Sequence, residues 1–234
     1  MITVTAQQRR ITCYHEAGHA VVTSLRGNRP SYLEVVDAGI SFEEIAAEHD
    51  NRFGFCKPSN GFETFGREFR HTNGDTVIRG FELPGYHPDT DEVDRQKARA
   101  FAKTLSEYDR RDWRRIIRGR VCMNIAGQVA EQHYTGAIPL QDLIDGSDWI
   151  EPWDFGDDDS HEMRQAARMA CLLPARNAYD RMSAITARAL LDHWQHVERI
   201  ADALESEGHL LFNDLTALIP AEIPNWPPAR STSK

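Results

Sequence analysis

Several absences in the 234-residue sequence narrow the classes of protein that it can encode. It has only four cysteines and no Cys-x-x-Cys pair, which argues against a disulfide framework and a cysteine zinc site. No Gly-x-x-x-x-Gly-Lys-Ser/Thr sequence occurs, so a P-loop nucleotide site is excluded. The longest apolar runs, such as residues 20–24, fall well short of the ~20 residues that span a bilayer. We therefore expect reduced, mostly buried thiols and no membrane span.

An excess of basic residues is also missing. Lysine and arginine total 27 against 36 acidic residues, a net charge of −9, so no face for nucleic acid or anionic lipid is expected. Residues 1–10 lack the apolar core of a signal peptide, which favours a cytoplasmic location. One basic run alternates with apolar positions and predicts a solvated or salt-bridged helix face; it comprises Arg110, Arg111, Arg114, Arg115, Arg118 and Arg120.

The feature with a direct chemical consequence is the sequence His15-Glu16-Ala17-Gly18-His19, an HExxH zinc motif. At 3.6 residues per turn, the two histidines lie one turn apart and can reach one metal ion from one helix face. Glu16 then stands beside the metal without binding it, and can take a proton from a zinc-bound water. This arrangement is typical of amide-bond hydrolysis.

The surroundings of the motif predict a helix. Thr5 and Gln8 can form a capping box, an apolar stripe continues to Leu25, and Gly27 can end the helix. Because a bare HExxH motif also occurs by chance, the alternative is an amphipathic helix whose two surface histidines never bind metal. A third ligand decides between the two interpretations.

The remaining pattern predicts a mainly helical protein with a small β element. Strands are expected at residues 31–36 and 53–58, and helices at 41–47, 89–108, 112–133, from about 159 to 172, and 175–207. Residues 134–155 are expected to form a loop, and 210–218 a short closing element. We expect one domain over residues 1–224 and a flexible tail over 225–234.

A catalytic zinc site usually has three protein ligands, so another part of the chain must supply one. The acidic stretch before the helix near residue 159 is the natural source. Its acids also suit a helix N-terminus, where Asp159 and Glu162 can form a cap. Chemistry alone leaves five candidates open, namely Asp154, Asp157, Asp158, Asp159 and His161.

The sequence resembles the peptidase domain of the FtsH-type ATP-dependent zinc metalloproteases in several ordered segments. Residues 14–22 resemble the zinc helix of that family, and residues 126–131 resemble its second motif, with Gln128 in place of an arginine. Asp159, followed by Met163, Ala167 and Arg168, is similar to the aspartate that supplies the third ligand. Residues 189–208 resemble the helix that closes the domain.

The resemblance implies a helical FtsH-like peptidase domain with Zn²⁺ held by His15, His19 and Asp159, and with Glu16 as the general base. Glu131 would lie near the metal as a supporting carboxylate. The stretch between Glu131 and the aspartates is longer than in the family, so Asp157 and Asp158 stay open as alternatives to Asp159. The ATPase and membrane anchor of the family have no counterpart here.

The sequence thus predicts a zinc metalloendopeptidase that hydrolyses exposed or unfolded polypeptides without ATP in the same chain. If residues 32–36 form an exposed edge strand beside the zinc helix, an extended peptide can dock there by strand addition. Alternatives are a regulatory protease specific for one partner and an inactive zinc-binding adaptor with a peptidase fold. A separate ATPase or a homo-oligomer is a possible partner, as suggested by the resemblance alone.

Overall fold

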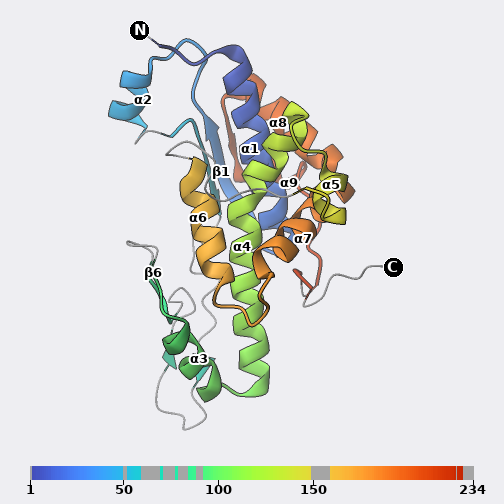
Figure 1. The fold of residues 1–234 in the computed structure, drawn as a ribbon. Helices are drawn as coiled ribbons and strands as arrows, with labels where there is room; N and C mark the ends of the chain where they lie inside the picture. The colour runs from blue at the N-terminus through green and yellow to red at the C-terminus, as the bar shows by residue number, and fades with distance from the viewer. Residues whose placement is uncertain are drawn as a thin grey trace.

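The protein is mainly helical, with three small antiparallel sheets among the residues described (Figure 1). A computed structural model describes residues 2–49, 52–58, 69–70, 77–78, 84–87, 92–148, 159–224 and 226–228. The prediction of a mainly α protein with a small β element is therefore confirmed. Among the helices that the structure describes, none combines the length and apolarity that crossing a bilayer requires.

Helix α1 (Ala6–Leu25) carries the HExxH motif and lies in the upper part of the view in Figure 1. It begins with the predicted capping box, in which the Thr5 hydroxyl accepts from the Gln8 amide at 3.1 Å and the Gln8 side chain accepts from the Thr5 amide at 2.9 Å. Such a cap stabilises a helix by about 1 kcal/mol. The chain leaves the helix through Gly27, whose φ of 82° lies in the left-handed region that favours glycine.

The main sheet lies beside α1 and has the strand order β2-β1-β7. Strand β1 (Pro30–Val35) pairs with β2 (Gly54–Pro58) on one side and with β7 (His209–Leu211) on the other. The hypothesis that the strand at 32–36 is an exposed edge is therefore wrong, because β7 covers it. Within the described residues, β2 pairs only with β1, so β2 is the edge strand that contacts α1.

Helix α4 (Glu107–Thr135) is the longest described element and packs against α1, α6 and α7. It starts five residues before the predicted position because Ser106 caps it, accepting from the Asp109 amide at 3.1 Å. Helix α3 (Arg95–Thr104) begins later than predicted, since Glu92–Val93 form strand β6, which pairs with β5 (Tyr86–His87). A second two-stranded sheet joins β3 (Phe69–Arg70) to β4 (Val77–Ile78).

Six shorter helices complete the described fold. Helix α2 (Phe42–Glu48) follows its predicted Ser41 cap, whereas α5 (Leu140–Asp145) lies in a stretch predicted as loop. Helix α6 is Asp159–Ala170. The helix predicted over 175–207 is two helices, α7 (Ala178–Asp192) and α8 (Trp194–Glu207), which meet at His193. Helix α9 is Phe212–Thr216.

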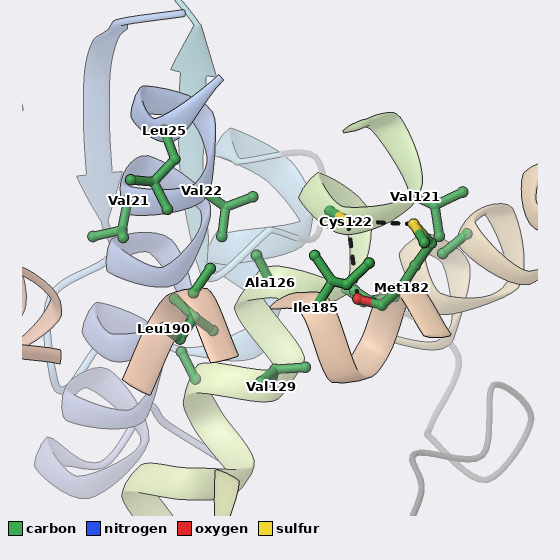
Figure 2. Close-up of a cluster of buried hydrophobic side chains, with 14 of the residues drawn as sticks. Val21, Val22, Leu25, Val121, Cys122, Ala126, Val129, Met182, Ile185 and Leu190 are labelled. Carbon is green, nitrogen blue, oxygen red and sulfur yellow. Dashed lines mark hydrogen bonds between the residues drawn. The ribbon is translucent and has the colours of Figure 1, made fainter. Parts of the chain in front are cut away.

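The main core lies where α1, α4, α7 and α8 meet, and Figure 2 shows part of it. Val21 and Leu25 of α1 and Leu190 of α7 are fully buried there. Trp226, at the start of the predicted tail, is also part of this core and is only 6% exposed. The core thus fixes α1 against α4, and this contact creates the site described next.

Candidate metal centre

The two histidines of the HExxH motif converge on α1 as their spacing predicts. The Nε2 atoms of His15 and His19 are 3.1 Å apart, and the two side chains are 14% and 12% exposed. They are therefore largely buried between helices, not surface groups on an isolated amphipathic face.

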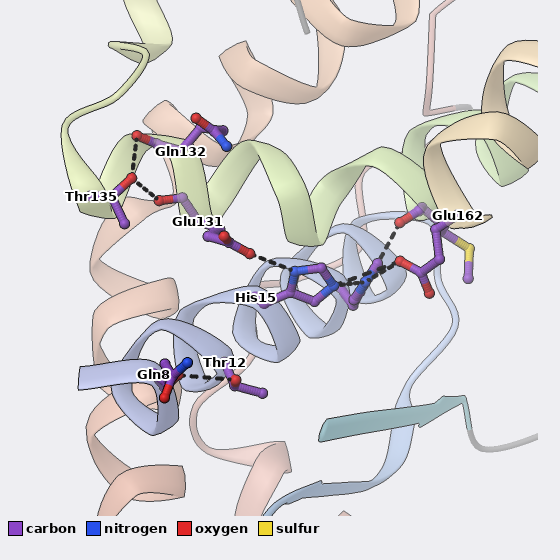
Figure 3. Close-up of polar contacts among 9 residues, drawn as sticks. Gln8, Thr12, His15, Glu131, Gln132, Thr135 and Glu162 are labelled. Carbon is purple, nitrogen blue, oxygen red and sulfur yellow. Dashed lines mark hydrogen bonds and ion pairs between the residues drawn. The ribbon is translucent and has the colours of Figure 1, made fainter. Parts of the chain in front are cut away.

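The other ring nitrogen of each histidine is held by α4. The Nδ1 atom of His19 lies 2.8 Å from the carbonyl oxygen of Met123, and Nδ1 of His15 lies 3.3 Å from Oε2 of Glu131 (Figure 3). A carbonyl or carboxylate oxygen only accepts, so in the neutral rings Nδ1 carries the hydrogen and donates it. Both Nε2 atoms are then left with a lone pair, which is the form that binds a metal ion.

A third acceptor reaches the same point from α6. Oε2 of Glu162 lies 3.0 Å from Nε2 of His19 and 3.7 Å from Nε2 of His15 (Figure 3). Within the described part of the chain, these three residues are the group of histidine, cysteine and acidic side chains close enough together to hold a metal ion. A His₂Glu set is one of the known ligand sets of catalytic zinc.

The spacing of the three atoms fits a tetrahedral metal ion. Metal–ligand bonds of about 2.0–2.1 Å at tetrahedral angles place ligand atoms about 3.3–3.4 Å apart. The observed separations of 3.0, 3.1 and 3.7 Å bracket that value. Three acceptor atoms at such distances are stabilised by positive charge between them, which a proton or a metal ion supplies, so the group can hold a metal ion.

The electrostatics of the site favour a positive charge. Burial lowers the pKa of His15, but the carboxylates of Glu131 and Glu162 outweigh it and raise that pKa well above its ordinary value. Burial likewise opposes the charge on Glu162, yet His19 and His15 lower the pKa of its carboxyl overall. The same carboxylates that stabilise a proton on the rings stabilise a metal cation there.

Two glycines allow α1 and α4 to approach closely at this point. A Cβ on Gly18, inside the motif, would lie 2.6 Å from the carbonyl oxygen of Ala126. A Cβ on Gly127 of α4 would lie 2.4 Å from Nε2 of His15 and 2.5 Å from Nε2 of His19. Any larger residue at 127 would occupy the space in front of the imidazoles, so this glycine helps to form the site.

Glu16 lies on the adjoining face of α1, toward the edge strand. Its side chain is 6% exposed, and a Cβ on Gly54 of β2 would lie 2.6 Å from its Oε1 atom. Two residues along the same strand, burial together with the charges of Glu16 and Glu162 raises the pKa of the Cys56 thiol well above its usual range. The carboxylate of Glu16 therefore lies against β2 at Gly54, on the side of the strand to which a Cβ would point.

The structure brings together His15, His19 and Glu131, as the sequence predicts. Asp159 is the first residue of α6, but its side chain lies outside the described residues, as do Asp154, Asp157 and Asp158. Glu162, considered from the sequence only as a capping partner, is the acidic side chain that meets the histidines. The signal that could have identified it is its i+3 spacing from Asp159, since both residues then share one helix face.

Comparison with known proteins does not assign this chain to a family. No family model matches it, and no curated protein is significantly similar to it. Any functional conclusion therefore rests on the site itself.

Proposed function

We propose that this protein is a zinc-dependent endopeptidase. The observation that carries the proposal is the convergence of two Nε2 atoms and the Glu162 carboxylate at 3.0–3.7 Å, with both Nδ1 atoms held by oxygen acceptors on α4. The HExxH spacing supports the peptidase assignment, because it adds a buried carboxylate, Glu16, directly beside the ligands.

His15, His19 and Glu162 would hold the zinc ion, and Glu131 would orient the first of these ligands. A zinc ion bound there supplies a Lewis acid that lowers the pKa of a coordinated water and polarises a carbonyl oxygen. His15, His19 and Glu162 would be three protein ligands, the number that catalytic zinc sites use.

Glu16 is the group that moves the proton. It takes one proton from the attacking water, whose oxygen forms a bond to the carbonyl carbon of the scissile amide. When the carbon–nitrogen bond breaks, Glu16 delivers that proton to the departing amine. The side chain is 6% exposed and lies close to Gly54, and such burial suits a group that must receive and return a proton at the same point.

The edge of β2 suits an extended polypeptide substrate. Within the described residues its outer side has no partner strand, and its first residue, Gly54, contacts Glu16. A peptide added to this edge would gain main-chain hydrogen bonds and run past the proposed base. An exposed or unfolded segment can adopt this extended form, whereas a folded domain cannot.

The test is metal content together with hydrolysis of casein, for the wild type and Glu16→Gln. We expect about one zinc per chain in both proteins, because Glu16 is not a ligand. Hydrolysis should fall by roughly 10²–10⁴-fold in the variant, the usual contribution of general acid–base catalysis.

Other outcomes separate the alternatives. Zinc without hydrolysis in either protein would favour a partner-specific protease or an inactive adaptor, and proteome-wide cleavage profiling would distinguish these two. A chain that binds no zinc would contradict the proposal outright.

A further inference from the structure

A pocket lies near the opposite end of α4 from the metal centre. It is formed by α3, the first turns of α4 and the segment that follows α6, and its volume is about 70 Å³, enough for a few water molecules. Arg114, in its wall, is thirteen residues before Gly127 on the same helix, or about 20 Å along the axis. The pocket is therefore separate from the histidines.

Three arginines line this small pocket: Arg95 and Arg99 of α3, and Arg114 of α4. No acidic residue is among the described lining residues, and none of the three arginines forms an ion pair with another part of the described chain. In a chain of net charge −9, a pocket with three guanidinium groups and no carboxylate among its described lining residues is unexpected.

Other members of the arginine run have structural partners. Arg110 donates to the carbonyl oxygens of Ala102 at 2.8 Å and Leu105 at 3.0 Å, and so joins α3 to α4. Arg115 is paired with Asp112 at 2.7 Å. The predicted salt-bridged face therefore accounts for Arg115 but not for Arg114.

Further hydrogen-bond donors lie near the three arginines of the pocket. Burial lowers the pKa of Arg118, and neighbouring arginines, Arg114 among them, lower it further. Trp113 also lines the pocket, and its buried indole N–H has no acceptor within the described part of the structure. Among the described side chains, this region is thus rich in hydrogen-bond donors and poor in acceptors.

We propose that this pocket binds a small oxyanion, specifically a phosphate group, between Arg95, Arg99 and Arg114. Guanidinium groups match the oxygens of phosphate in pairs, and their hydrogen bonds to an anion are about twice as strong as neutral ones. Leu172 and Leu173 add apolar wall beside the guanidinium groups, and hydrogen bonds are stronger next to such low-dielectric surface. Free inorganic phosphate and the phosphate of a small metabolite offer the same group.

The first test is calorimetric titration of the wild type with inorganic phosphate at low salt, beside Arg99→Gln and Arg114→Gln. Arg111→Gln is the matched control, because Arg111 is exposed on the same helix and outside the pocket. We expect saturable binding by the wild type and by the control, and an affinity at least about tenfold lower in either pocket variant.

A second measurement uses Cys171, which is half-buried and lines the pocket. Saturating phosphate should slow its alkylation in the wild type and leave the rate unchanged in Arg114→Gln. This result does not depend on peptidase activity, so it stands or falls independently of the proposed function.

The same titration with glucose 6-phosphate distinguishes the sources. Tighter binding than phosphate would identify a phosphorylated metabolite as the ligand, and equal binding the free anion; both support the site. Absence of saturable phosphate binding would overturn the proposal. An equal loss of phosphate affinity in Arg111→Gln and in the pocket variants would also overturn it, because it would indicate non-specific electrostatic attraction. Binding of a single-stranded oligonucleotide with equal dependence on Arg111 would also overturn it.

Discussion

The two ends of α4 have opposite chemistry. Toward its C-terminus, Met123 and Glu131 turn acceptors toward α1, and the histidines they hold present lone pairs to one point. Near its N-terminus, Arg114 contributes a donor to a pocket that has no described acid in its wall. One end is built for a cation and the other for an anion, although the net charge of the chain reveals neither.

The comparison also shows what decides whether a charged residue is structural or functional. Arg115 and Arg114 are neighbours in one basic run, but within the described residues only Arg115 forms an ion pair, with Asp112 one turn away. Composition cannot separate two such residues. Their positions in the structure can, because Arg115 lies 2.7 Å from Asp112 on the same helix, whereas Arg114 lines the pocket.

The largest effect should follow from changing the acidic ligand. Glu162→Gln removes the negative charge at the metal centre, and we expect metal affinity to fall by at least about 100-fold, measured by competition with a chelator dye. Asp159→Asn is the matched variant, three residues earlier on α6, and should retain metal. If Asp159→Asn lost metal and Glu162→Gln retained it, Asp159 would be the third ligand instead.

A matched pair of glycine substitutions tests whether the two ends are independent. Gly127→Ala places a methyl group within 2.5 Å of both Nε2 atoms, so we expect loss of about one equivalent of metal. In Gly119→Ala the methyl group meets only the guanidinium end of Arg26, which can shift, so metal content should stay normal. Both substitutions raise helix propensity by about 1 kcal/mol. A difference in metal content between the two variants therefore reports the steric effect of the methyl group at position 127. Full metal binding by Gly127→Ala would contradict the described geometry.

A smaller change is expected from Glu131→Gln. This residue holds Nδ1 of His15, and losing such a partner typically lowers metal affinity by about 10–100-fold. Glu107→Gln makes the same chemical change at the other end of α4, where the side chain is 90% exposed, and should leave affinity unaltered. Equal affinities for the two variants would show that the Glu131 contact is incidental.

The smallest effect concerns thiol reactivity. Burial raises the pKa values of Cys13 and Cys122 to about 11, so at pH 8 only about one thiol in a thousand is ionised. Since the thiolate is the reactive form, both should resist a thiol reagent at pH 8 in the native protein and react after unfolding, whereas the half-buried Cys171 reacts first. Rapid native labelling of Cys122, identified by mass spectrometry, would show that α4 is not packed as described.

Local signals in the sequence predicted α1 well. The Thr5–Gln8 capping box and the i,i+4 spacing of His15 and His19 depend only on residues within one or two turns. Glu131, which the family resemblance implies near the metal, lies 3.3 Å from Nδ1 of His15. The break between α7 and α8 at His193 was missed, because a continuous apolar stripe is compatible with two helices that share one core.

The sequence by itself determined that two imidazoles lie on one helix face with a carboxylate beside them, since helix geometry links residues four apart. Only the tertiary structure decided which distant groups join them. Glu162 shares a helix face with Asp159, so periodicity cannot choose between the two, and the docking of α6 on α4 brings Glu162 within 3.0 Å of His19. Likewise, only the structure shows that β7 pairs with β1 and makes it the central strand of the described sheet, because hydrogen bonds between segments far apart in the chain have no local signature.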